Sequence, residues 1–137
     1  MKKVFFTLII ALFFSAISFA QLTGVKTIPG DYPTVAAAIA ALNASGVGAG
    51  GVTFNVAAGH TETFTSPTAG RITTLTGSVS SPIVFQKTGT GNNPLITSGT
   101  GVAYIDAIIA IGGCDYITFD GIYLRDKPSN VSVGHMR

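Results

Sequence analysis

The chain has 137 residues, a formal net charge of +2 and a single cysteine, Cys114. Lys2 and Lys3 account for two of its eight basic residues, and all six acidic residues lie downstream, so residues 21–137 carry equal numbers of basic and acidic side chains. This balance argues against nucleic-acid binding, which needs a clustered basic face. One cysteine excludes an internal disulfide, and the length predicts one domain.

Residues 1–20 have the pattern of a signal peptide. A positively charged start precedes an apolar run over residues 4–14, and small residues stand at Ser18 and Ala20. The run is shorter than the roughly 20 apolar residues that a membrane-spanning helix needs. We therefore expect cleavage after Ala20, secretion or display at the cell surface, and no transmembrane segment in the remaining chain.

Residues 21–51 are predicted to form an N-terminal cap made of a short strand at Ile28, one helix and a glycine-rich loop. Thr34 is a suitable N-cap, and apolar residues follow it at helical spacing. These are Val35, Ala38, Ile39 and Leu42. Asn43 and Gly46 are expected to end the helix. Residues 46–51 have no large side chain, so a flexible connection is predicted there.

A three-residue strand pattern then recurs three times. The copies are Val52-Thr53-Phe54, Ile83-Val84-Phe85 and Ile117-Thr118-Phe119, separated by 31 and then 34 residues. Apolar residues on either side of an outward position are typical of a β-strand. The predicted strands cover residues 52–56, 71–76, 83–87, 95–97, 108–111, 116–119 and 122–124, with turn residues between them.

The repeat favours a mainly β solenoid, a right-handed parallel β-helix, over an antiparallel sandwich. In a solenoid each coil buries its apolar face against the next coil, and the first coil needs a cover such as an amphipathic helix. A sandwich buries its end strands by sheet-on-sheet packing and needs no such helix. Gly121 also marks a corner after Asp120, where the second strand continues the first instead of reversing.

Two segments of the chain resemble right-handed β-helix proteins of the pectin-lyase-like fold. The first, similar to the N-terminal cap of pectin methylesterases and their relatives, is Asp31-Tyr32-Pro33-Thr34-Val35-Ala36-Ala37-Ala38-Ile39. The second, similar to a coil found throughout such proteins, is Cys114-Asp115-Tyr116-Ile117-Thr118-Phe119-Asp120-Gly121-Ile122. More narrowly, the chain resembles the N-terminal part of large exported bacterial surface proteins that often end in a C-terminal sorting domain.

The end of the sequence departs from that pattern. Residues 52–137 allow only three or four coils, near the minimum of about three for a stable stack, and then stop at Gly134-His135-Met136-Arg137. We therefore expect an incomplete β-helix, a fragment whose further coils and sorting domain lie elsewhere.

The candidate site residues are few. The resemblance implies clustered Asp residues for pectin hydrolases and esterases, or Asp with Arg and calcium for lyases, but Asp115 and Asp120 stand at the two ends of one predicted strand and are expected to form turns. His60 and Glu62 are the only close pair of a histidine and a carboxylate, and we expect a solvated turn there. Asp106 is an outward strand residue or a cation ligand.

The remaining polar residues suggest no chemistry. Residues 125–127 are predicted to be a solvated exit loop, and Cys114 to be a small buried apolar residue. We expect no catalytic residue, metal or cofactor in this chain.

The predicted function is an exported structural or glycan-contacting module of a bacterial cell-surface protein, with extracellular polysaccharide or the remainder of a longer chain as partner. The alternative is the N-terminal fragment of a polysaccharide lyase, esterase or glycoside hydrolase of the same fold.

Overall fold

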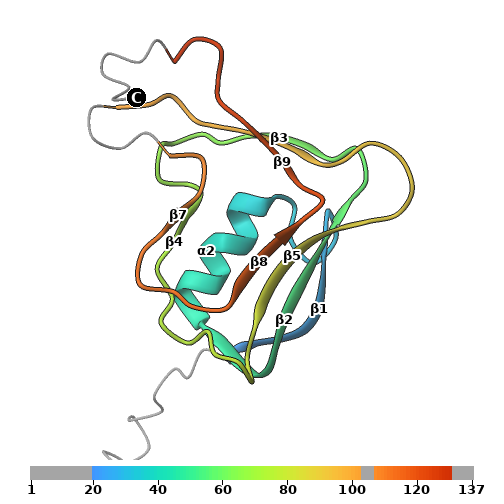
Figure 1. The fold of residues 1–137 in the computed structure, drawn as a ribbon, viewed down its shortest axis with the longest axis vertical. Helices are drawn as coiled ribbons and strands as arrows, with labels where there is room; N and C mark the ends of the chain where they lie inside the picture. Colours follow the sequence, from blue (N-terminus) through green and yellow to red (C-terminus); the bar gives the residue numbers. More distant parts are fainter. Residues whose placement is uncertain (1–19, 103–106, 131–137) are drawn as a thin grey trace, which may run out of the picture.

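The computed structural model describes residues 20–102 and 107–130, which form a mainly β structure with one helix (Figure 1). The first half holds β1 (Leu22–Ile28), α2 (Val35–Ser45), β2 (Val47–Ala57), β3 (Thr61–Thr63) and β4 (Arg71–Ile72). The second half holds β5 (Ile83–Thr88), β6 (Leu95–Thr97), β7 (Ala110–Ile111), β8 (Ile117–Asp120) and β9 (Tyr123–Arg125).

The strands form three parallel sheets that the chain visits in a fixed order. The sheets are β1-β2-β5-β8, β3-β6-β9 and β4-β7. From β2 onward, each circuit of the chain adds one strand to the first sheet, then one to the second and, in the circuits that begin with β2 and β5, one to the third. All pairs of named strands are parallel, so the antiparallel sandwich considered above is wrong.

The three repeated triplets lie side by side in register. Phe54 pairs with Phe85 and Phe85 with Phe119, and the flanking residues of each triplet pair in the same way. The rings of Phe54 and Phe85 stack with centroids 4.5 Å apart, and those of Phe85 and Phe119 stack at 5.1 Å. This aromatic ladder fixes the register, because a slip of one residue would turn every phenylalanine to the outside.

The helix α2 covers the interior at the first circuit of the chain. As predicted, the Thr34 hydroxyl accepts a hydrogen bond from the Ala37 N–H (3.0 Å), and Gly46, at φ 71°, donates to the Leu42 carbonyl (2.8 Å). The four predicted apolar positions of the helix are all buried. In Figure 1 the helix lies within the outline that the three sheets draw.

The turn after β1 completes this cover. Tyr32 packs edge-on against Phe54, with ring centroids 5.8 Å apart. Its ring therefore covers the N-terminal end of the aromatic ladder. The Asp31 carboxylate accepts hydrogen bonds from the backbone N–H and the hydroxyl of Thr27, and these bonds lower the pKa of Asp31. The backbone N–H of Thr27, on the outer edge of β1, is thereby paired.

Two segments differ from the prediction. Residues 47–51 were expected to be a flexible loop but belong to β2, and Val47 is buried against the helix and core. Gly51, at φ 80°, lies so close to the Pro82 carbonyl that a side chain there would collide with it. The glycines therefore permit close packing between successive circuits, where the sequence suggested only flexibility.

The short strands are also imperfectly predicted. β1 extends seven residues where a strand only at Ile28 was expected, and β3 was not predicted. β3 is entirely polar and β1 mixes polar and apolar residues, and both pair through their backbones with parallel neighbours. β4 ends at Ile72, four residues earlier than expected, and β7 begins at Ala110, two residues later than expected.

In the part of the chain that the structure describes, no helix combines the length and apolar character needed to cross a bilayer. The predicted signal peptide lies outside the described residues, except for Ala20.

We predict that Phe85→Ala lowers the free energy of unfolding by about 3–5 kcal/mol, because Phe85 is fully buried and stacks on a ring at each face. Val79→Ala is the control, since Val79 is 78% exposed. Urea denaturation of both variants followed by circular dichroism measures the difference. Equal stability of the two variants would contradict the ladder's role.

Candidate functional site

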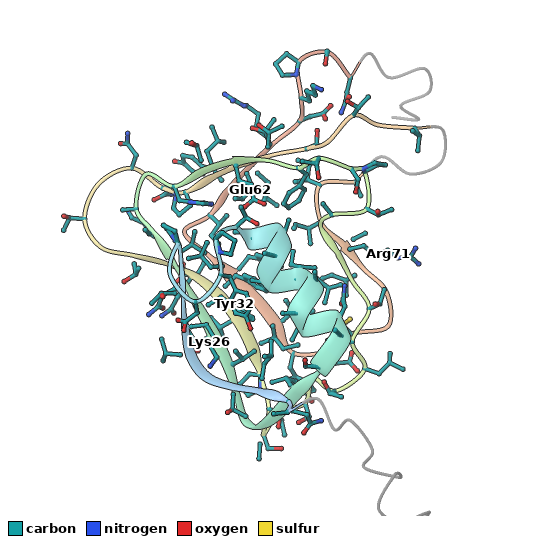
Figure 2. The ribbon with its side chains drawn as sticks, turned by 180° about the vertical axis from the view of Figure 1, so that it is seen from behind. Lys26, Tyr32, Glu62 and Arg71 are labelled. Carbon is teal, nitrogen blue, oxygen red and sulfur yellow. The ribbon has the colours of Figure 1, made fainter. Side chains whose placement is uncertain are left out.

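Glu62 joins the sheet to the helix. Its Oε2 accepts a hydrogen bond from the Val35 N–H (2.7 Å) and its Oε1 accepts one from the Ala36 N–H (3.0 Å). Figure 2 shows Glu62 beside this end of α2. The first N–H groups of a helix have no partner within the helix and carry its partial positive charge, so the carboxylate satisfies two donors and a favourable dipole together.

The His60–Glu62 pair is thus placed differently from the expected solvated turn. The side chains of His60 and Glu62 are only 11% and 7% exposed, and His60 Nε2 lies 3.4 Å from Glu62 Oε2. The Glu62 carboxylate, expected to be solvated, instead accepts two backbone N–H groups at the helix N-terminus. No local sequence pattern indicates this contact, because the two partners are 26 and 27 residues apart.

The other predicted candidates are not gathered into a site. Asp106 lies outside the described residues. Asp120 is the last residue of β8, and Gly121 follows it at φ 65°, as expected for a corner. Asp115 is exposed two residues before the same strand. Within residues 20–102 and 107–130 there is no group of three or more His, Cys, Asp or Glu side chains placed to hold a metal ion.

Residues 126–130 form a polar clasp and not the solvated exit loop that was expected. The Ser98 hydroxyl donates to Asp126 Oδ1 (2.6 Å) and accepts from the Lys127 N–H (2.8 Å). Asn130 Nδ2 donates to the Ser98 hydroxyl, to the Gly99 carbonyl and to Asp126 Oδ1. The clasp ties the end of the described chain to the segment after β6, and Ser98 is buried beneath it.

A hollow in the described structure lies on the outer side of the β3-β6-β9 sheet. It has a volume of about 500 Å³, and we call it the outer hollow. Its walls combine backbone, hydroxyl, amide, aliphatic and aromatic groups. The lining residues are Gly59, Thr61, Gly91, Asn92, Asn93, Leu95 and Tyr123.

The outer hollow follows from a difference in length between three equivalent turns. The connections from β2 to β3 and from β8 to β9 are short, whereas residues 89–94 form a longer loop between β5 and β6. Figure 1 shows this loop projecting at the right of the molecule. The loop forms one wall, and Thr61, Leu95 and Tyr123, which are register neighbours on adjacent strands, form the other.

Hydrogen bonds hold the loop in place. Gly59 N–H donates to the Asn92 carbonyl and Leu95 N–H to the His60 carbonyl, both at 2.8 Å. Lys87 Nζ donates to the Gly91 carbonyl (2.6 Å) and to Asn93 Oδ1 (3.1 Å). The wall is therefore braced by the neighbouring circuit and by its own strand.

Sequence reasoning missed the outer hollow. Residues 89–94 were interpreted only as turn residues, and Tyr123 only as part of a strand. The sequence signal that could have indicated the hollow is the alternation of side chains in the last strand. Leu124 is in register with the buried Ile96, so its neighbour Tyr123 faces outward.

Comparisons of this chain with protein-family models, with curated proteins and with solved structures found no match.

We predict that Glu62→Ala destabilises the protein by about 2 kcal/mol, because two backbone N–H groups at the helix N-terminus lose their charged acceptor. Glu62→Gln retains one acceptor oxygen and is expected to lose about half as much. Urea denaturation measures stability, and hydrogen exchange at Val35 and Ala36 reports the contact directly.

The control for these variants is Asp115→Asn, which neutralises an exposed carboxylate. It is expected to change stability by less than about 0.5 kcal/mol. Unchanged exchange at Val35 and Ala36 in Glu62→Ala would show that the carboxylate does not hold the helix.

Cys114 provides a test based on pH. Desolvation by burial raises the pKa of its thiol, and Sγ lies 3.2 Å from the Ile72 carbonyl, to which it donates. Because the thiolate is the reactive form, at pH 8 the folded protein should contain less thiolate and react with iodoacetamide more slowly than the urea-unfolded protein. Raising the pH should accelerate labelling of the folded state. Labelling of the folded protein as fast as that of the unfolded protein would contradict this environment.

Proposed function

We propose that this chain is the N-terminal part of an exported, right-handed parallel β-helix of pectin-lyase-like type that serves as a structural, glycan-contacting module at the bacterial cell surface. The observation that carries the proposal is the in-register stacking of the three triplets in a sheet whose strands are all parallel. Parallel connections between strands are almost always right-handed, which supports the handedness.

The closed first circuit supports an N-terminal position in such a stack. Tyr32 and α2 cover the ladder at β2, whereas Phe119 at the other end of the ladder is only partly buried. In the described part of the chain, β7, β8 and β9 each pair with one strand only, and all three stand at the same end of their sheets. A further coil with apolar residues opposite Ile117 and Phe119 would continue the ladder.

The glycan-contacting role rests on the outer hollow. The hollow opens on the outside of a sheet, away from the buried ladder, and is lined by uncharged polar groups beside one exposed aromatic ring. Small-molecule sites combine apolar or aromatic walls with a few well-placed polar groups, and the volume of the outer hollow lies in the range of about 300–1,000 Å³ typical of them. A surface scaffold with such a hollow is suited to holding a polysaccharide.

Export is tested by expressing the complete chain in a bacterial host and sequencing the N-terminus of the product outside the cytoplasm. We expect a product that begins at Gln21, because the small residues at Ser18 and Ala20 fit the signal-peptidase preference. Ala20→Arg should block processing while leaving the remainder of the chain unchanged. Full-length protein retained in the cytoplasm would overturn the proposed export.

Glycan contact is tested by passing the exported protein through columns of immobilised neutral and acidic polysaccharides. Retardation by at least one polysaccharide, released by the same polysaccharide in solution, is the expected result. Passage through every column without retardation would overturn the glycan-contacting role.

A further inference from the structure

We propose that the outer hollow binds a neutral pyranose unit of an oligosaccharide, with the ring stacked on Tyr123 and its hydroxyl groups bonded to the side-chain amides of Asn92 and Asn93. This inference rests on the proposed glycan-contacting function and assigns a site and a sugar class to it. The basis of the proposal is that one exposed aromatic ring and two amide side chains line the same braced hollow.

Tyr123 has no evident role in holding the fold. Its side chain is 62% exposed, and it stands in register with Leu95 on the outward side of the sheet. Another coil added beside β9 would pair with the strand edge and cover the inward-facing Leu124, but it would leave the outer face of Tyr123 open. An exposed tyrosine on a rigid strand presents a flat apolar face with a polar tip, which suits a sugar ring with one apolar face.

The amides supply the directional contacts. Asn93 Oδ1 accepts from Lys87 Nζ, which fixes the orientation of this amide. Among the described residues, neither the Asn93 NH₂ group nor the Asn92 side chain has a hydrogen-bond partner in the protein. Amides both donate and accept, as sugar hydroxyls do, so this pair matches a polyhydroxylated ring.

The charge of the hollow favours a neutral sugar over an acidic one. None of its seven lining residues is charged. Lys87, on β5, donates to two neutral oxygens of the loop, the Gly91 carbonyl and Asn93 Oδ1, and is not itself a lining residue. Glu62, on β3, is directed to the helix N-terminus. No cationic side chain lines the hollow to pair with an anionic sugar, so burying a carboxylate there would cost much of its hydration.

The loop is already ordered, so binding need not order it. Its backbone bonds to β3 and its lysine brace hold the amides in position before any ligand arrives. Immobilising side chains and loops on binding weakens affinity, and a braced loop avoids most of this loss.

The test is titration of the complete, exported protein with four defined probes, followed by ¹H–¹⁵N NMR. The probes are cellohexaose, xylohexaose, mannohexaose and hexagalacturonate. At least one neutral hexasaccharide should shift the amide signals of Thr61, Asn92, Asn93 and Tyr123, and it should bind more tightly than hexagalacturonate.

The variants separate this site from glycan binding elsewhere. Tyr123→Ala should weaken binding at least about tenfold, Asn92→Ala about three- to tenfold, and Tyr123→Phe less than about threefold, since phenylalanine retains the stacking face. Tyr116→Ala is the matched control, because Tyr116 is 57% exposed but does not line the hollow. It should leave affinity unchanged. Circular dichroism melting of each variant confirms that it is folded.

The outcomes distinguish the two proposals. Binding that survives Tyr123→Ala and Asn92→Ala unchanged would overturn this site while leaving the glycan-contacting function intact. Tighter binding of hexagalacturonate would overturn the neutral-sugar assignment. No binding of any probe, together with passage through every polysaccharide column, would overturn both proposals.

Discussion

The aromatic ladder of Phe54, Phe85 and Phe119 is the interaction on which the rest of the structure depends. Side chains alternate between the two faces of a strand, so stacking three rings on the inner face also determines which residues of β2, β5 and β8 face outward. The same register carries the chain from the first sheet to the second at equivalent positions. The outer hollow, with Thr61, Leu95 and Tyr123 in adjacent positions, is therefore a consequence of inward packing.

The aromatic ladder has two ends, and specific side-chain contacts cover the end at β2. Tyr32 meets Phe54 edge-on, α2 buries four apolar residues, and Glu62 fixes the first turn of the helix. The helix needs this contact because it has no acidic residue in its own first turn. Its N-terminal charge is balanced instead by a carboxylate from the second sheet, which ties the cover to the first circuit.

The elements that could be predicted from the sequence are those with a large apolar signal. The helix, its Thr34 cap and the three triplets depend on local periodicity and were placed correctly. β3 was missed because its residues, Thr61–Thr63, are polar and gain their structure from pairing with β6. Residues 47–51 were misinterpreted because a glycine run has the same composition in a flexible loop and in a tightly packed strand. Glu62 and the outer hollow depend on contacts between distant residues, which a local pattern does not contain.

The separation between inner and outer faces also explains why a hollow can form at a turn without disturbing the core. Inward residues such as Phe85 are constrained on both sides by the neighbouring circuits, so a change there disturbs the stack. The loop at residues 89–94 lengthens a turn that is short in the circuits before and after it, and it leaves the strand register of β5 and β6 intact. A longer turn thus adds a wall to the outer face without altering the ladder, and the braces from Lys87 and Gly59 give that wall a fixed shape. The loop therefore depends on the stacked strands for its position, and the hydrogen bond from Gly59 to Asn92 in turn joins it to the preceding circuit.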